Sequence, residues 1–225
     1  MKTAHLAAAL LLPFAFSGCS RTPDSQYRNS LRKVKAALEA DSAAGRFRES
    51  LSADMKLKTV RDRLDATLMS HPANAFADDA YLVRALLRDP DSGTPETWRD
   101  FLVRHPSAEF EPWSVENLQG IFGDSVLKAP KGPVFEARFR LISALASRKR
   151  CSEALAEARA AMALYSSAGS PSSVEAMLAL GYLRAGSCFS RSGDRKAAES
   201  AYREAAGFFD EPRIRASFER ELSKR

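Results

Sequence analysis

Few side chains of this 225-residue chain are suited to covalent or metal chemistry, since it contains three histidines and three cysteines. His71 and His105 each precede a proline at the predicted end of a helix, where an imidazole can interact with the last carbonyl groups. No further ligands accompany them at metal-site spacing, and no serine stands in a nucleophile-elbow pattern. The sequence also lacks a phosphate-binding glycine loop. We therefore predict no catalytic residues, metal or cofactor, and a protein that is not an enzyme.

The chain begins with a segment typical of export. Lys2 precedes an apolar run of about eleven residues, which is too short to span a bilayer, and the run closes with Phe16-Ser17-Gly18-Cys19. This pattern resembles the signal peptide and lipobox of bacterial lipoproteins. The resemblance implies a signal peptide over 1–18 that is cut before Cys19, and a Cys19 thiol that carries lipid. A buried N-terminal helix is the alternative.

The polar segment 19–25 is expected to be a short tether between the lipid and the folded domain. Ser20 after the lipidated cysteine favours the outer membrane, with the domain facing the periplasm. An exported chain can form disulfides, and Cys151 and Cys188 remain as an even pair. We expect either a disulfide or two buried free thiols at these positions.

Removal of 1–18 leaves 207 residues with a formal charge of +5. We expect this excess to be spread along the chain in mixed patches such as Glu211 to Arg225, which are typical of solvated helix faces. Attraction to anionic lipid or to an acidic partner is the alternative. No nucleic-acid-binding motif is present, so no nucleic-acid partner is expected.

The hydrophobic pattern predicts an all-α chain of about ten helices. Apolar residues recur at three- and four-residue steps in Leu57, Val60, Leu64 and Leu68, and the alanine-rich run 154–163 has high helix propensity. Proline and glycine turns punctuate these segments, and no stretch alternates long enough to predict a strand.

Two matching turns, His71-Pro72 and His105-Pro106, lie 34 residues apart, and each is expected to join two amphipathic helices. Further along, small and bulky residues recur at fixed offsets: Tyr182, Ala185, Gly186, Phe189, Gly193, Asp194, Ala198, Tyr202 and Ala205. This pattern resembles the tetratricopeptide repeat, in which each unit is an antiparallel helix pair. A weaker copy begins 44 residues earlier, with Lys149-Arg150 in place of Gly193-Asp194.

The resemblance implies a tetratricopeptide-like superhelix over 26–225, with its clearest repeats at 135–168 and 179–212. Small residues such as Gly186 would let helices approach closely, Gly193 would end one helix in a left-handed turn, and Asp194 would cap the next. Residues 26–54 are expected to form a capping hairpin, and residues 212–224 a terminal helix. A generic helical bundle is the alternative.

By the same resemblance, the first helix of each unit would line a peptide-binding groove. Its positions here are Arg140, Ser143, Arg184, Ser187 and Arg191. Arginines facing one groove would suit a carboxylate-bearing peptide. Alternatively, these arginines are solvent-exposed or pair within the chain, with Glu136 and Glu175 as partners.

The His-Pro turns are similar to those of the tetratricopeptide lipoproteins that act in outer-membrane assembly. That family implies an anchored scaffold that docks envelope proteins through its groove, with no small-molecule substrate. An activator of peptidoglycan synthases or hydrolases, and a lipid or glycan carrier, are the alternatives.

Overall fold

The computed structural model describes residues 22–43, 55–88, 94–168 and 174–224, and every extended regular element in these ranges is a helix. The helices are α1 (Pro23–Ala43), α2 (Met55–Ser70), α3 (Ala77–Arg88), α4 (Pro95–Arg104), α5 (Pro112–Asn117), α6 (Asp124–Leu127), α7 (Gly132–Ser147), α8 (Cys151–Ala168), α9 (Glu175–Arg191), α10 (Arg195–Phe208) and α11 (Pro212–Ser223). The all-α prediction is confirmed.

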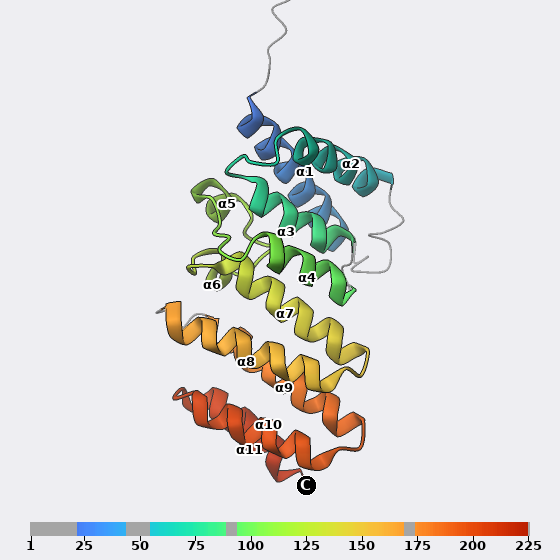
Figure 1. The fold of residues 1–225 in the computed structure, drawn as a ribbon. Coiled ribbons are helices and arrows are strands. Elements are labelled where there is room, and N and C mark those ends of the chain that lie inside the picture. The colour runs from blue at the N-terminus through green and yellow to red at the C-terminus, as the bar shows by residue number, and fades with distance from the viewer. Residues whose placement is uncertain (1–21, 44–54, 89–93, 169–173, 225) are drawn as a thin grey trace, which may run out of the picture.

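The long helices stack as antiparallel pairs along one axis, from α1 and α2 at one end to α10 and α11 at the other (Figure 1). Each first helix also contacts the first helix of the next pair, in the order α1, α3, α7 and α9. This arrangement is a helical repeat fold, in which every unit buries its apolar face against its neighbours. The predicted repeats correspond to α7 with α8 and to α9 with α10.

The folded domain begins at Pro23, three residues before the predicted boundary. Proline at the first helical position is favourable because its missing N–H would lack a partner there in any case. The Thr22 hydroxyl accepts a hydrogen bond from the Ser25 N–H, at 3.3 Å, and so caps the helix. The last three residues of the predicted tether 19–25 therefore belong to α1. The capping hairpin is made by α1 with α2, which begins at Met55 and lies beyond the predicted range 26–54; residues 44–54 are outside the described ranges.

The two His-Pro turns, each expected to join two amphipathic helices, lead into helices of different length. After His71 the chain forms α3, whereas after His105 it forms only the short helices α5 and α6. Gly120 between these two has a φ of 91°, a left-handed conformation that ends regular structure. This insertion explains why a regular 34-residue period does not continue into α7.

The turns after α7 and α9 have the same hydrogen-bond pattern. The Asp194 N–H donates to the Phe189 carbonyl and the Arg150 N–H to the Leu145 carbonyl, each at 3.0 Å. The left-handed residues are Gly193, with a φ of 85°, and Lys149, with a φ of 59°. The side chain of Asp194 accepts from the Ala197 N–H at 3.0 Å, so the predicted helix cap is present.

The second repeat is held together by the close approach of α9 and α10. Tyr182 and Tyr202 are fully buried between them, along with Ala198 and Ala205. Gly186 faces the Tyr202 ring so closely that a Cβ on it would overlap three ring atoms. The small residue predicted at this position is thus required by the packing.

Substitution of Gly186 by Ala should lower the free energy of unfolding by about 1–3 kcal/mol, because the added methyl group must displace the Tyr202 ring. Gly207 in α10 is the matched control, since a Cβ there meets nothing within 4 Å and Gly207→Ala should be neutral or stabilising. Urea unfolding followed by circular dichroism measures both, and equal midpoints for the two variants would contradict the packing argument.

Candidate functional site

The first helices of the two clear repeats, α7 and α9, lie side by side and enclose a shallow hollow of about 350 Å³ that opens to solvent. Its lining is Ser143, Ala146, Ser147, Leu180, Leu183, Arg184, Ser187 and Arg191. The α7 side is built of small residues, which leave the space open. The α9 side carries longer residues at three- and four-residue steps, so they project from one face of that helix. We call this hollow the α7–α9 groove.

Four of the five groove residues predicted from the sequence line this groove, and Arg140 does not. Its Nε lies 2.7 Å from Oε1 of Glu136, one turn earlier on α7. The Glu136 side chain is only 9% exposed, and a carboxylate removed from water needs a nearby cation. Arg140 is therefore an intrachain partner, as the alternative interpretation has it. Glu175 instead accepts a hydrogen bond from the Tyr165 hydroxyl at 2.6 Å.

The serine hydroxyls of the groove are engaged within the fold. Ser143 donates to the Phe139 carbonyl at 2.8 Å and also accepts a hydrogen bond from Arg184. The Ser187 hydroxyl lies 3.1 Å from the hydroxyl of the buried Tyr202. These serines therefore position the wall of the groove, and ligand contacts fall to its longer side chains.

The two arginines of the groove are held differently. The guanidinium of Arg184 lies 4.4 Å above the centre of the Phe139 ring, a cation–π geometry that fixes its position. Arg191 in the last turn of α9 is exposed, and no acidic side chain of the described residues lies within ion-pair distance of it. Leu180, 49% exposed, supplies apolar surface beside them. Two cations and an apolar wall suit a peptide that carries both an acidic and an apolar group.

Leu180, Ala146 and Ser147 are groove residues that sequence reasoning missed. Leu180 lies three residues before Leu183 and four before Arg184, so the helical spacing of α9 places it on the same face. The sequence pattern does not identify Ala146 and Ser147 as groove residues. A small residue lines a hollow only when a neighbouring helix leaves space above it, and this depends on the tertiary structure.

Cys151 and Cys188 form a disulfide that joins the start of α8 to α9, with their Cα atoms 5.4 Å apart. The structure thus brings the even pair together and selects the disulfide over two free thiols. This crosslink fixes α9 against the first repeat and so holds the two walls of the groove at their spacing.

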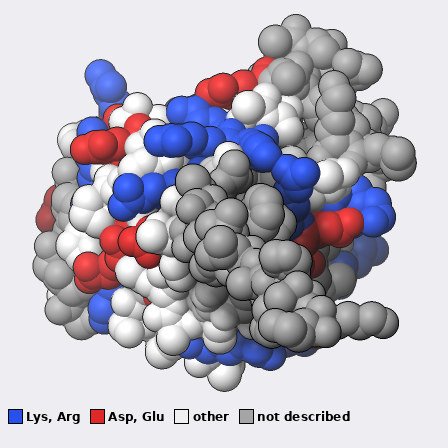
Figure 2. All heavy atoms as spheres, turned by 90° about the horizontal axis from the view of Figure 1, so that it is seen from above, with Lys and Arg blue, Asp and Glu red and all other residues white. Residues whose placement is uncertain are grey.

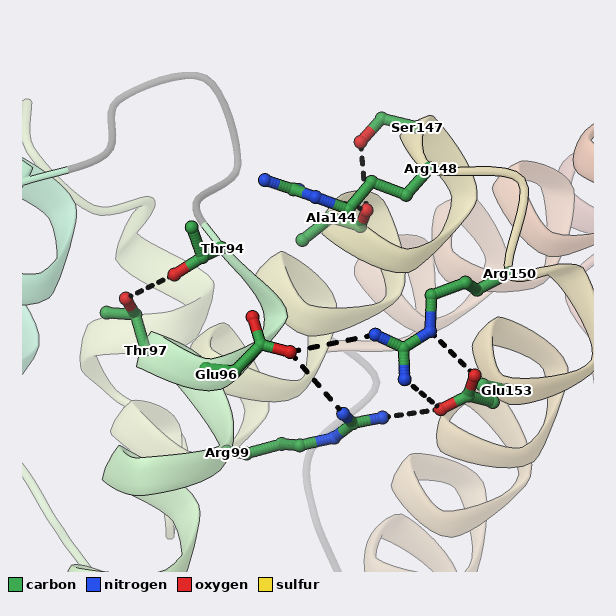
Figure 3. Close-up of polar contacts among 9 residues, drawn as sticks. All are labelled: Thr94, Glu96, Thr97, Arg99, Ala144, Ser147, Arg148, Arg150 and Glu153. Carbon is green, nitrogen blue, oxygen red and sulfur yellow. Dashed lines mark hydrogen bonds and ion pairs between the residues drawn. The ribbon is translucent and has the colours of Figure 1, made fainter.

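A network of ion pairs links the first half of the chain to the groove-bearing repeats (Figure 3). Arg99 of α4 lies 2.6 Å from Glu153 of α8, and Glu153 also accepts two hydrogen bonds from Arg150, each of 2.7 Å. Glu96 lies 3.7 Å from Arg150. These side chains are all more than a third exposed, so the pairs connect α4 to the start of α8 and add little stability.

The two histidines do not form a shared site. Nδ1 of His105 lies 2.7 Å from Oδ1 of Asp78, and its ring packs between those of Tyr81 and Phe101. The carbonyl of His71 accepts a hydrogen bond from the Tyr27 hydroxyl at 2.9 Å. Within the described segments, no three His, Cys, Asp or Glu side chains converge as a metal site would require.

Asp79 is an unusual buried carboxyl that sequence reasoning did not find. It lies on α3, is fully buried, and accepts a hydrogen bond of 3.2 Å from the N–H of Glu111, the residue that precedes α5. Burial raises the pKa of Asp79 to about 7, although the nearby Ser114 hydroxyl and the hydrogen bond from the Glu111 N–H oppose the shift. This carboxyl ties the short helix α5 to the repeat core.

Cys19 lies outside the described residues. In the ranges that the structure does describe, no helix combines the length and apolar content needed to cross a bilayer. Comparison of the chain with models of known protein families finds no match, and comparisons with curated proteins and with solved structures find none either.

Reduction of the disulfide should lower the free energy of unfolding by about 4 kcal/mol in the chain-entropy model, because the bond closes a loop between residues 37 positions apart. Urea unfolding with and without dithiothreitol measures this difference. A Cys151→Ser/Cys188→Ser variant is the control and should show no effect of dithiothreitol. Alkylation of both thiols in the unreduced native protein would contradict the pairing.

Replacement of Asp79 by Asn should flatten the dependence of stability on pH. The folded protein holds the Asp79 proton up to about pH 7, whereas an unfolded aspartate loses it near pH 3.9. The stabilisation from this group is therefore complete below pH 3.9 and is lost as pH rises through 7, by up to about 4 kcal/mol. Urea unfolding between pH 4 and pH 8 should show the variant losing less stability than the native protein. The exposed Asp124→Asn is the control, and parallel profiles for the native and Asp79→Asn proteins would contradict this account.

Proposed function

We propose that this chain is a lipoprotein of the bacterial outer membrane, anchored through Cys19, whose periplasmic repeat domain docks other proteins of the cell envelope. The domain acts as a scaffold in envelope assembly. The observation that carries the proposal is the α7–α9 groove, where residues predicted from a tetratricopeptide resemblance lie together around an open hollow. We also propose that the chain is a divergent tetratricopeptide protein.

The disulfide between Cys151 and Cys188 supports an exported location. Structural disulfides persist in oxidising compartments such as the periplasm and are rare in the reducing cytosol. The lipobox-like segment Phe16-Ser17-Gly18-Cys19 also indicates export from the cytosol, and it does not depend on the disulfide. Two features far apart in the chain thus favour one location.

The groove favours binding over catalysis and over transport of a lipid. Ser143 and Ser187 are engaged within the fold, so neither hydroxyl is held as a nucleophile by a histidine. A lipid carrier needs an apolar cavity, and the apolar hollow among Phe135, Phe139 and Ile142 encloses no volume that a water-sized group could enter. An activator of peptidoglycan synthases or hydrolases would use the same groove, with those enzymes as its partners.

The test is a crosslinking experiment in cells with the tagged full-length protein. A photo-crosslinking residue at Leu180, inside the groove, should capture a defined envelope protein, and the same residue at Val103 should not, although Val103 is 79% exposed on α4. Arg191→Ala should reduce the capture at least several-fold, because a cation facing the partner's carboxylate is removed. Arg213→Ala on α11 is the matched control.

Cys19→Ala tests the anchor in the same cells, because the variant should lose incorporation of labelled fatty acid. Equal crosslinking from Leu180 and Val103 would contradict the groove, and continued acylation of the Cys19 variant would contradict the anchor. The two halves of the proposal can therefore fail separately.

A further inference from the structure

The net charge of the chain after Cys19 is concentrated next to the predicted anchor, whereas we expected it to be spread along the chain in mixed patches. Residues 20–70, which include α1 and α2, contain eleven Lys and Arg against seven Asp and Glu, a net charge of +4. The remaining residues 71–225 contain twenty-two basic and twenty-one acidic residues, a net charge of +1. Most of the positive charge therefore belongs to a quarter of the sequence.

In three dimensions the described part of this basic quarter, α1 and α2, lies at one end of the molecule. Helices α1 and α2 form the first pair of the stack, and α1 begins at the extreme end in Figure 1. Figure 2 views the molecule onto this end, and the Lys and Arg side chains form a band across its described part, with acidic groups around the band. The excess of Lys and Arg in this part of the sequence therefore lies on the surface of the α1–α2 end.

Most of the acidic groups on these two helices are already paired. Asp62 is bound by Lys58 at 2.7 Å, Glu39 lies 3.7 Å from Lys35, and Asp65 pairs with Arg84 of α3. The described residues place no acidic side chain within ion-pair distance of five basic ones, which are Arg28, Arg32, Lys33, Arg61 and Arg63. Among the described residues, the surplus at this end is therefore positive charge that no acidic side chain neutralises in an ion pair.

Two of these cations are fixed by aromatic rings. The guanidinium groups of Arg28 and Arg32 lie 6.0 Å and 5.3 Å from the centre of the Trp113 ring of α5, and Arg28 lies 5.1 Å from that of Phe76. Trp113 meets Phe76 edge to face, which holds both rings in place. Because the rings hold these arginines, part of the positive charge at this end is positioned before any partner arrives.

We propose that the α1–α2 end of the superhelix binds the anionic phospholipid headgroups of the membrane that carries the anchor. The inference rests on the proposed lipid anchor for its geometry. Pro23 follows Cys19 by four residues, which span at most about 14 Å, so an anchored chain keeps this end at the bilayer. Basic residues attract anionic lipid over about one Debye length, and the end nearest the anchor is the one that meets this range. The groove lies two helix pairs further along the stack and is therefore separated from the end that contacts lipid.

Vesicle binding tests this contact without the anchor. The chain from Ser20 onward keeps every described residue and lacks only the lipid attachment. At low salt it should bind vesicles containing phosphatidylglycerol and phosphatidylethanolamine more than about tenfold better than vesicles of phosphatidylcholine, and added salt should abolish the difference.

Charge reversal identifies the face. Lys33→Glu/Arg61→Glu/Arg63→Glu should weaken binding to the anionic vesicles more than about tenfold, since none of these residues contacts an aromatic ring or an acidic partner in the described structure. Lys196→Glu/Arg213→Glu/Arg220→Glu makes the same charge change at the α10–α11 end and should weaken binding far less. Circular dichroism of both variants verifies that they fold.

Equal loss in the two triple variants, or no preference of the native chain for anionic vesicles, would overturn the proposal. Because the probe carries no lipid, this result is independent of the Cys19→Ala result. If the chain binds vesicles but is not acylated at Cys19, it is a peripheral membrane protein without a lipid anchor. If it is acylated but does not bind vesicles, it is an anchored domain that makes no contact with headgroups.

Discussion

The rest of the structure depends on how closely α9 approaches its neighbours. Gly186 lies against the Tyr202 ring, and alanines of α10 are fully buried at the same interface. A helix can pack at this distance only where side chains are small, and the large rings then fill the space on either side. With α9 held from behind by α10, its opposite face is turned toward α7. The groove on the α7-facing side of α9 therefore depends on the packing of α10 against the other side of α9.

Polar contacts set the orientation of the helices more than they stabilise the fold. Arg159 of α8 makes a bidentate pair with Glu204 of α10, and the Tyr182 hydroxyl donates to the same carboxylate at 3.3 Å. Burial raises the pKa of Tyr182, and the adjacent Glu204 carboxylate raises it further. A similar contact lies within one unit, where Arg138 of α7 pairs with Glu157 of α8 at 2.7 Å. Each fixes one helix against the next where apolar packing alone would allow rotation.

The two ends of the superhelix differ in their electrostatics, and the proposed roles follow this difference. The α1–α2 end has surplus positive charge, whereas the α10–α11 end mixes charges and closes with the buried Phe218 of α11 stacked on Phe209. A repeat stack must end in a helix with a polar outer face, and α11 meets that requirement. In the proposed arrangement, one end meets lipid and the groove near the other presents its arginines to a protein partner.

Local features were predictable from the sequence by itself because they depend on residues close together in the chain. The helices follow from apolar spacing, and the turn at Gly193-Asp194 follows from the conformational freedom of glycine and the short acceptor side chain of aspartate. Cys151 and Cys188 were identifiable as a pair, although the sequence left open whether they bond. Only the tertiary structure decided which side chains a groove residue meets. Arg184 turns to Ser143 of α7, Ser187 turns to Tyr202 of α10, and Asp79 is buried beneath α5. These outcomes depend on contacts with residues of other helices and on which polar groups become buried. The spacing of residues along the chain determines neither of these.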